Sequence, residues 1–402
     1  MSAPFDFCRV IAPVEPEEFF RDYWEKRPLL LFRSDPGYYA DLFSLADVDY
    51  LISSTDLRHP AVRLVKNGSE IPLQEYTTDI PWGSHTFERV ADADRLLTEY
   101  QQGSTIILQA LHRSWRPLSQ LCRSLERQFS YPVQTNVYLT PRASQGFAPH
   151  YDTHDVLVLQ IAGSKHWRLY DSPLLLPHRS QPYQASRVQI GAPLNEFDLN
   201  AGDLVYLPRG YIHEALTSDT DSLHITMGIL ATTWVDVFAE ALSTCQRDPR
   251  FRKSLPVGFV GRSEEFGELL TVFSEAVSLE EVLTRISERF VSSRLPLLEG
   301  HLTELDQVDR LDLETVVRRR RDLIYRIIPD PKGESVSLLF HGKKVKFPGY
   351  VEPALRFLVE AGDFKACAIP GDLDDPGKLV LVRRLVKEGF LTIHKEDSEN
   401  RR

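Results

Sequence analysis

The sequence predicts a β-rich N-terminal domain, followed by a helical segment and a second compact unit. From about residue 104, short segments rich in Val, Ile, Leu and Tyr alternate with Gly, Pro, Asp or Ser, as strands do. After residue 233, two segments carry apolar residues at spacings of three and four, which is typical of helices. At roughly 150 residues per domain, the 402 residues allow about two to three domains.

The first 233 residues hold the predicted strands. Residues 15–24 read as a helix with apolar residues on one side, Pro28 ends it, and Leu29–Phe32 then reads as a buried strand. The further predicted strands are Thr105–Leu108, Asn136–Thr140, Val156–Ile161, His166–Tyr170, Leu204–Leu207 and Leu223–Ile229. Several short strands separated by turn signals indicate an all-β sandwich or barrel.

The remaining chain divides into two parts that differ in their predicted secondary structure. Helices are predicted over Trp234–Leu242 and Ser278–Phe290, and they are too few for a core of their own, so their apolar faces need a partner such as a second subunit. Beyond residue 305, predicted helices followed by a short hairpin resemble a winged helix, and the polar tail is expected to fray. The elements expected there are helices over Leu313–Ile328, Pro353–Glu360 and Lys378–Glu388, a strand over Phe390–His394, and the tail Lys395–Arg402. The predicted domains are therefore 1–233, 234–305 and 306–402.

Composition and charge exclude several classes of protein. Hydrophobic residues make up 42% and charged residues 26%, which are ordinary globular values. The net charge of -10 argues against a protein that neutralises nucleic-acid phosphates. The four cysteines lie far apart without a C-x-x-C, which argues against a cysteine zinc site or a disulfide framework and fits a reducing cytosol. The start shows no signal-peptide pattern and no stretch approaches 18 apolar residues, so we expect a cytoplasmic protein with no membrane span.

Two motifs carry candidate metal ligands. In Gly146–Asp152 the residues His150 and Asp152 are two apart, and on a strand they would share a face. An isolated H-x-D is common by chance. In Gly202–His213 a strand runs into a tight Pro/Gly turn that can project His213 back into the barrel, although an ordinary β-turn with a histidine nearby reads the same way.

Together the motifs supply two histidines and one aspartate from different parts of a predicted barrel. This is the ligand set of the 2-His-1-carboxylate facial triad of non-haem Fe(II) oxygenases. Three further positions stay open, two for a bidentate 2-oxo acid and one for O2. Lys165 follows the predicted strand Val156–Ile161 and, if buried, would need a counter-charge, which the distal carboxylate of 2-oxoglutarate would supply. The alternative is a surface lysine at a hairpin turn.

With these residues in place, the sequence resembles the JmjC-type ribosomal oxygenases of the cupin superfamily, which are Fe(II)- and 2-oxoglutarate-dependent protein hydroxylases. The resemblance covers nearly the whole chain. Thr217 stands where many cupins have Asn, but that position is not a metal ligand. The segments that carry the resemblance are residues 20–29, Asn136–Pro141, Ser144–Asp152, Val158–Arg168 and Gly202–His213.

The resemblance implies a fold and further roles. It implies a double-stranded β-helix (the cupin/JmjC jelly roll), an α-helical dimerisation module with a homodimer, and a C-terminal winged-helix domain. It implies Fe(II), 2-oxoglutarate and O2 as cofactor and cosubstrates, and a ribosomal or other basic protein as the substrate, hydroxylated on Arg or His. Tyr138 would hydrogen-bond 2-oxoglutarate and Asn136 would line the same pocket; ordinary core packing is the alternative for both.

Other histidines and arginines are further candidates for metal, substrate or nucleic-acid binding. His154 shares the same-face period and could be a ligand or a substrate contact. His166 alternates away from Lys165 and is expected to face outward, and His224 reads as a core histidine with its hydrogen bonds satisfied. The run Arg318–Arg321 reads as a solvated helix face, and nucleic acid is not expected as a partner.

Three other functions stay open at this stage. One is a 2-oxoglutarate oxygenase acting on a small molecule or a peptide. Another is a non-catalytic cupin and winged-helix protein that binds DNA as a regulator. Histone demethylation is the third, because JmjC folds include demethylases.

Overall fold

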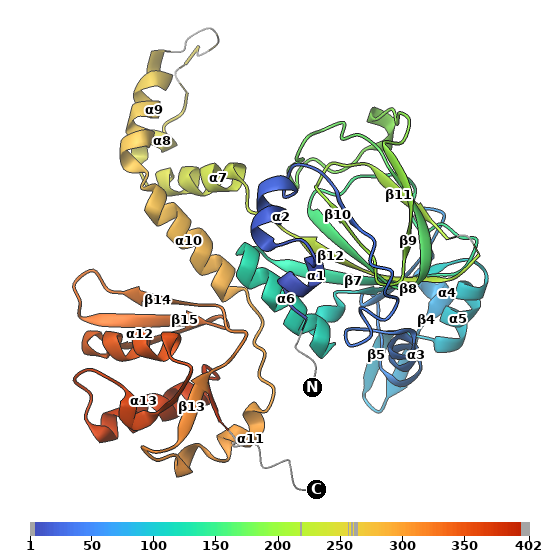
Figure 1. Cartoon of the computed structure of the whole chain (residues 1–402). Coiled ribbons are helices and arrows are strands. Elements are labelled where there is room, and N and C mark those ends of the chain that lie inside the picture. Colours follow the sequence, from blue (N-terminus) through green and yellow to red (C-terminus); the bar gives the residue numbers. More distant parts are fainter. Residues whose placement is uncertain (1–4, 218, 256, 259, 261–263, 395–402) are drawn as a thin grey trace, which may run out of the picture. The chain divides into compact units, whose positions relative to one another are not determined.

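The computed structural model describes residues 5–217, 219–255, 257, 258, 260 and 264–394 (Figure 1). The chain divides into two compact units, residues 1–231 and 232–402. A further division near residue 305 stays a prediction. No helix among the described residues is both long enough and apolar enough to cross a membrane.

The first unit is built on a large sheet of antiparallel strands. The main sheet has the order β1-β10-β8-β12-β7-β6-β2-β3, with β9 and β11 also paired to β8, and β4 and β5 form a separate hairpin. The strands are β1 (Leu29–Leu31), β2 (Val62–Lys66), β3 (Ser69–Glu70), β4 (Thr77–Trp82), β5 (His85–Ala91), β6 (Thr105–Gln109), β7 (Val133–Thr140), β8 (Asp155–Leu169), β9 (Asn195–Asn200), β10 (Leu204–Leu207), β11 (His213–Leu216) and β12 (Ser222–Ile229). The helices are α1 (Phe7–Ile11), α2 (Pro16–Asp22), α3 (Leu45–Ser54), α4 (Leu73–Tyr76), α5 (Ala93–Gln101) and α6 (Arg116–Phe129).

Strand β8 is long enough to belong to two layers of antiparallel strands. The two strands expected over Val156–Ile161 and His166–Tyr170 are one continuous strand, so the expected break between them is wrong, as is the alternative of a hairpin turn at Lys165. The first half of β8 pairs with β10 and β12, and the second half pairs with β9 and β11. Gly163 lies at the change of partner with φ of 63°, and a Cβ there would lie 1.7 Å from the Asp221 carbonyl oxygen. Glycine is therefore the residue that lets β8 continue from one layer into the other.

The core of the first unit lies between the main sheet and helices α1, α2 and α6. Edge-to-face aromatic contacts fill it, with ring centroids of Phe7 5.4 Å from Phe19 and 5.0 Å from Phe129. The helix predicted from residue 15 is α2. The strand predicted over Leu29–Phe32 is β1, but only Leu29 is buried and Phe32 is 56% exposed, because β1 is the edge strand beside β10.

The second unit combines a helical part with two small sheets. The sheet orders are β17-β13-β18 and β14-β15-β16. The strands are β13 (Val316–Arg319), β14 (Tyr325–Pro329), β15 (Ser335–Phe340), β16 (Lys343–Pro348), β17 (Asp363–Lys365) and β18 (Leu391–Ile393). The helices are α7 (Trp234–Cys245), α8 (Pro249–Arg252), α9 (Glu264–Ala276), α10 (Leu279–Ser292), α11 (His301–Leu305), α12 (Glu352–Glu360) and α13 (Asp375–Lys387).

The second unit confirms most of the predicted elements and corrects one. The predicted helices at 353–360 and 378–388 are α12 and α13, and the predicted terminal strand is β18. The helix predicted over Leu313–Ile328 is wrong, because the chain forms β13 and β14 there. The adjacent β-branched residues Val316 and Val317 favour a strand, and β13 pairs with both β17 and β18. The predicted frayed tail, residues 395–402, lies outside the described residues.

The arginine run is not a solvated helix face. Arg318 donates to Asp363 Oδ2 at 2.8 Å from β13, and Arg320 is buried and forms an ion pair with Glu304. Both guanidinium groups therefore serve the packing of this unit.

The helical part holds a small core of its own. Val237 and Ala241 of α7 are buried together with Val282 of α10, so the expectation that these faces lack any partner within the chain is only partly right. Apolar side chains that stay exposed on the two helices include Trp234, Phe238, Leu242, Leu279 and Leu283.

Candidate metal centre

A cavity of about 330 Å³ opens between the two layers of the first unit. Residues from β7, β8, β11 and β12 line it, together with the connection between β7 and β8. Every residue predicted for the site lies on its wall: Asn136, Tyr138, His150, Asp152, Lys165 and His213.

The backbone brings the two predicted ligand segments together. His150 and His213 exchange both backbone hydrogen bonds, at 3.1 and 2.8 Å. The amide of Gly210 donates to the carbonyl of Asp152 at 3.1 Å, and Gly210 has φ of 99° with no room for a Cβ. The expectation that His150 and Asp152 lie on a regular strand is wrong, because only His150 makes an isolated bridge. The convergence arises from these cross-links between segments.

A buried ion pair fixes the turn before His213. Arg209 donates to Asp155 Oδ2 at 2.7 Å, and the hydroxyl of Tyr206 donates to Asp155 Oδ1 at 2.9 Å. Asp155 is fully buried at the start of β8, and Arg209 also contacts Glu25 at 2.5 Å. Burial raises the pKa of Asp155, while the charge of Arg209 and its hydrogen bond oppose that rise. The ion pair between Arg209 and Asp155 therefore holds the turn that precedes β11 against the first residue of β8.

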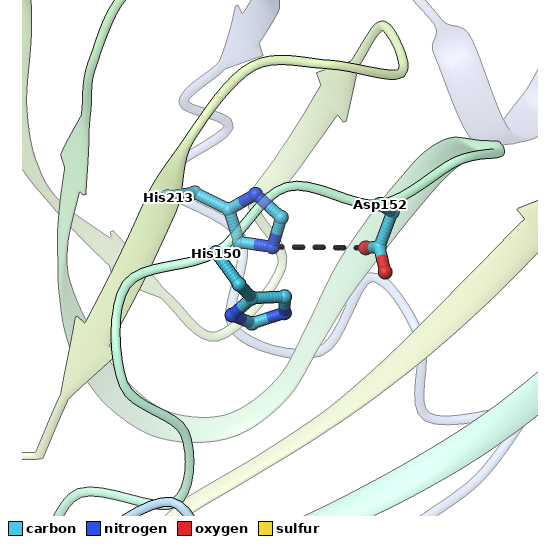
Figure 2. Close-up of side chains that lie close together, drawn as sticks. All are labelled: His150, Asp152 and His213. Carbon is cyan, nitrogen blue, oxygen red and sulfur yellow. Dashed lines mark ion pairs between the residues drawn. The ribbon is translucent and has the colours of Figure 1, made fainter. Parts of the chain in front are cut away.

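The side chains present a complete set of donor atoms to one point. The Nδ1 proton of His150 is directed at the carbonyl of Ala148 at 2.8 Å, and that of His213 at the carbonyl of Tyr211 at 3.1 Å. Each ring is thereby fixed in the tautomer that leaves Nε2 free as a ligand. One ligand atom from each of His150, Asp152 and His213 lies within 4.8 Å of the others, and His213 Nε2 is 3.7 Å from Asp152 Oδ2 (Figure 2). Two imidazoles and one carboxylate are a donor set that fits a ferrous ion.

The protonation states suit metal binding. Burial and the neighbouring His150 lower the pKa of His213 to about 4, so its ring is neutral at pH 7. Burial alone would raise the pKa of Asp152, but the three histidines around it hold that pKa below its ordinary value. Neutral imidazoles and an ionised carboxylate are the forms that coordinate a divalent cation.

Lys165 is a buried cation in the same cavity. It is 5% exposed, and its Nζ donates to Thr140 Oγ1 at 3.0 Å. No carboxylate pairs with it among the described residues, and burial lowers its pKa from 10.5 to about 7. An anionic group entering the cavity would supply the missing counter-charge, so the observed environment fits a dicarboxylate cosubstrate.

Two residues on β7 and one on β12 complete the wall next to the lysine. Asn136 accepts a hydrogen bond from the amide of Ala110 at 3.1 Å, so its side chain is held against β6. Tyr138 stacks on His224 with ring centroids 4.8 Å apart, and desolvation followed by the charge of Asp152 raises the pKa of Tyr138 to about 12. Its hydroxyl is therefore protonated at pH 7 and can donate.

His224 was missed as a site residue. The expectation of a satisfied core histidine is wrong: His224 is buried, but its Nδ1 has no partner among the described residues and its ring lines the cavity. Burial and the neighbouring Lys165 hold its pKa well below the ordinary value, so the ring is neutral. Its register opposite Tyr138 was the signal that could have identified it, and that register depends on the pairing of β12 with β7.

The remaining candidates fall outside the donor set. His154 lines the cavity but does not belong to the cluster of three. His166 faces outward as expected and contacts Asp198 at 2.9 Å. Thr217, the departure from the cupin pattern, donates to the carbonyl of Pro141 and holds the neighbouring loop.

Comparisons with known proteins agree with this geometry. The JmjC domain family model matches residues 109–237. Ribosomal oxygenase 2 of Mus musculus is 31% identical over 84% of this chain and 77% of that protein. Ribosomal oxygenase 1 of Gallus gallus is 36% identical over 63% of this chain, which covers 42% of that protein, so the chain spans less than half of this relative.

Solved structures show the same fold. The Escherichia coli ribosomal oxygenase YcfD, solved in complex with cobalt and 2-oxoglutarate, covers 95% of this chain with a TM-score of 0.54 at 18% identity. Fold and cavity together thus define a JmjC domain of the cupin type with two histidines and an aspartate at its centre. The chain belongs to the JmjC ribosomal oxygenase family.

Proposed function

We propose that the chain is an Fe(II)- and 2-oxoglutarate-dependent dioxygenase that hydroxylates an Arg or His side chain of a ribosomal or other basic protein in the cytoplasm. The observation that carries the proposal is the convergence of His150, Asp152 and His213 within 4.8 Å, in the same cavity as a buried lysine. Membership of the ribosomal oxygenase family supports the same reaction class.

Each residue of the site has a role that follows from its position. His150, Asp152 and His213 hold the ferrous ion, and the two Nδ1 hydrogen bonds keep both rings aimed at it. Bound iron, with 2-oxoglutarate and O2, supplies the oxidising power that places one oxygen atom in a C–H bond of the substrate. The protein supplies the geometry and the dry surroundings for that step.

The buried wall of the cavity holds the end of 2-oxoglutarate that lies away from the metal. Lys165 pairs with the distal carboxylate of 2-oxoglutarate, and the hydroxyl of Tyr138 donates to the same molecule. Asn136 lines this part of the pocket. His224 backs Tyr138 and fixes the plane of its ring.

The acidic character of the protein suits a basic substrate. The net charge is -10, and a carboxylate, Glu214, lines the cavity one residue after His213. Tyr170 donates to Glu214 at 2.6 Å, Gln145 donates to it at 3.2 Å and the Arg168 guanidinium lies 3.7 Å from it, so the carboxylate is held in place. An oriented carboxylate favours the approach of an Arg or a protonated His side chain.

The test is a turnover assay with the full-length protein. The protein is incubated with Fe(II), 2-oxoglutarate, O2 and purified ribosomal proteins, and succinate release and the gain of one oxygen atom are followed by mass spectrometry. We expect both products with the wild type and neither with Asp152→Ala. Asp198→Ala, which removes an outward-facing carboxylate, is the matched control and should keep both. Normal turnover by Asp152→Ala, or succinate release without any modified protein, contradicts the proposal.

We also infer that the helical segment is a homodimerisation module. Trp234, Phe238 and Leu242 are spaced four apart on α7 and are all more than half exposed. Light scattering should find a dimer for the wild type and a monomer for Phe238→Glu; an unchanged mass contradicts this assignment. Residues 306–402 are proposed to be winged-helix-like, and nucleic acid is not proposed as a partner because the protein is acidic.

A further inference from the structure

A groove of about 580 Å³ in the second unit runs between strand β16 and helix α13. We propose that this groove binds an extended peptide of alternating acidic and apolar residues, which pairs with β16 as an additional strand. The inference concerns a different part of the chain from the metal centre and does not depend on the proposed hydroxylation.

The hydrogen-bonding pattern leaves one edge of β16 open. β16 is the last strand of the sheet β14-β15-β16, and it follows β15 through a two-residue turn, His341 and Gly342, both with positive φ. Such a turn makes Phe340 and Lys343 a hydrogen-bonded pair, and the bond from the Gly349 amide to the Glu334 carbonyl continues the same alternation.

It follows that the alternate residues of β16 point their backbone groups away from β15. These are Lys344 and Lys346, each with one N–H and one C=O directed at the open edge. Among the described residues, neither of them bonds to backbone outside its own sheet. The edge therefore offers four main-chain groups in the spacing that an added strand requires.

Much of the wall opposite β16 is apolar, while Arg384 and Glu388 line it near the C-terminal end of α13. Val380 on α13 is 67% exposed, Tyr350 just beyond β16 is 57% exposed, and both line the groove with Leu373 and Leu381. The volume lies within the range of about 300–1,000 Å³ that is usual for ligand clefts. An added strand would turn every second side chain towards this wall.

The other face of the added strand would meet positive charge. Lys344 and Lys346 share the face of β16 opposite to the buried Val345, and among the described residues neither lysine has an ion-pair partner. Lys343 and Arg384, in contrast, both pair with Glu388. Acidic side chains at alternate positions of the peptide would lie beside the two unpaired lysines as cross-strand partners.

Lysines on an edge strand can also serve only to prevent edge-to-edge aggregation. The groove distinguishes the two roles, because a protective edge needs no apolar wall facing it. Residues of α13 line the groove together with β16, so the helix would cover an added strand on one side. We therefore assign the edge to peptide binding.

The experiment uses the full-length protein and a fluorescent synthetic peptide in which Glu and Val alternate. We expect saturable binding by fluorescence anisotropy, together with slower backbone amide exchange at Lys344 and Lys346. Lys346→Pro removes one outward N–H and keeps the pairing with β15, and it should weaken binding at least about tenfold. Lys346→Gln, which removes only the charge, should weaken it less.

Two further variants secure the interpretation. Val380→Glu changes an exposed helix position, leaves the strand intact and should also weaken binding, so the test does not depend on the stability of the proline variant. Lys253→Gln makes the same change as Lys346→Gln at an exposed lysine outside the groove and should bind normally. Equal binding of a peptide with the same composition in scrambled order, equal binding by Lys346→Pro, or preference for a DNA duplex over the peptide would overturn the proposal.

Discussion

Replacing Lys165 by methionine is expected to stabilise the ligand-free protein and to abolish its response to 2-oxoglutarate. Burial lowers the pKa of Lys165 from 10.5 to about 7, and no carboxylate offsets that burial among the described residues. At about 1.4 kcal/mol per pKa unit, this lowering of the Lys165 pKa costs the folded protein about 5 kcal/mol of stability at pH 7. Methionine keeps the length of the side chain but loses the hydrogen bond to Thr140, so we expect a net gain of about 2–4 kcal/mol at pH 7.

The sign of the pH dependence follows from proton binding. Between about pH 7 and pH 10.5 the unfolded chain holds a proton on Lys165 more often than the folded protein does, so wild-type stability rises with pH through this window. The advantage of Lys165→Met should therefore be largest at pH 7 and below, and should vanish near pH 10.5. For the same reason, the affinity of the wild type for 2-oxoglutarate should fall as pH rises above about 7, because binding then requires uptake of a proton.

The assay is urea unfolding of the ligand-free proteins across this pH window, followed by thermal-shift titration with Mn(II) and 2-oxoglutarate. Mn(II) replaces Fe(II) without O2 chemistry. Lys253→Met, at an exposed lysine, is the control and should match the wild type in both measurements. A Lys165→Met protein that is less stable than the wild type at pH 7, or one that still responds normally to 2-oxoglutarate, would refute the reasoning.

Three further predictions concern the frame of the site. Asp155→Ala leaves the buried Arg209 without its main partner and should lower the free energy of unfolding by about 3–5 kcal/mol in urea titrations; a loss below about 1 kcal/mol argues that the pair is not structural. Gly163→Ala should prevent normal folding, judged by circular dichroism and solubility, because its Cβ has no space, whereas Gly191→Ala should be tolerated because its Cβ meets nothing within 4 Å. Tyr138→Phe keeps the ring stack but removes the hydroxyl, so the KM for 2-oxoglutarate should rise about fivefold with little change in kcat; an unchanged KM excludes that hydrogen bond.

The sequence was most informative where chemistry depends on residue type and spacing. His150, Asp152 and His213 stand out because metal ligands are few in kind and their motifs contain the turn residues that place them. The strand predictions around them agree with β6, β7, β10 and β12 because short segments rich in Val, Ile, Leu and Tyr between turn residues mark strands. The break expected between two strands before Lys165 was wrong, because Gly163 marks a change of pairing partner in one long strand as readily as it marks a turn.

Strand pairing between distant parts of the chain determined features that local sequence patterns do not show. His224 reads as core on its own strand, and only the register of β12 against β7 turns its ring to the cavity beside Tyr138. The segment with Arg318 and Arg320 was predicted to be a helix, but it pairs with β17 and β18 from further along the chain, and Asp363, the acidic partner of Arg318, lies 45 residues away. The buried pair that holds the turn before His213 is equally invisible in sequence, because Asp155 and Arg209 lie 54 residues apart.

The central claim is that His150, Asp152 and His213 hold one divalent cation at which 2-oxoglutarate binds. The most direct measurement is titration of the full-length protein with Mn(II), following the loss of the free-ion signal by electron paramagnetic resonance, with and without 2-oxoglutarate. The account predicts one tightly bound ion per chain in the wild type, tighter binding when 2-oxoglutarate is present, and neither effect in His213→Ala. Equal Mn(II) binding by His213→Ala, or no influence of 2-oxoglutarate on the wild type, would contradict it.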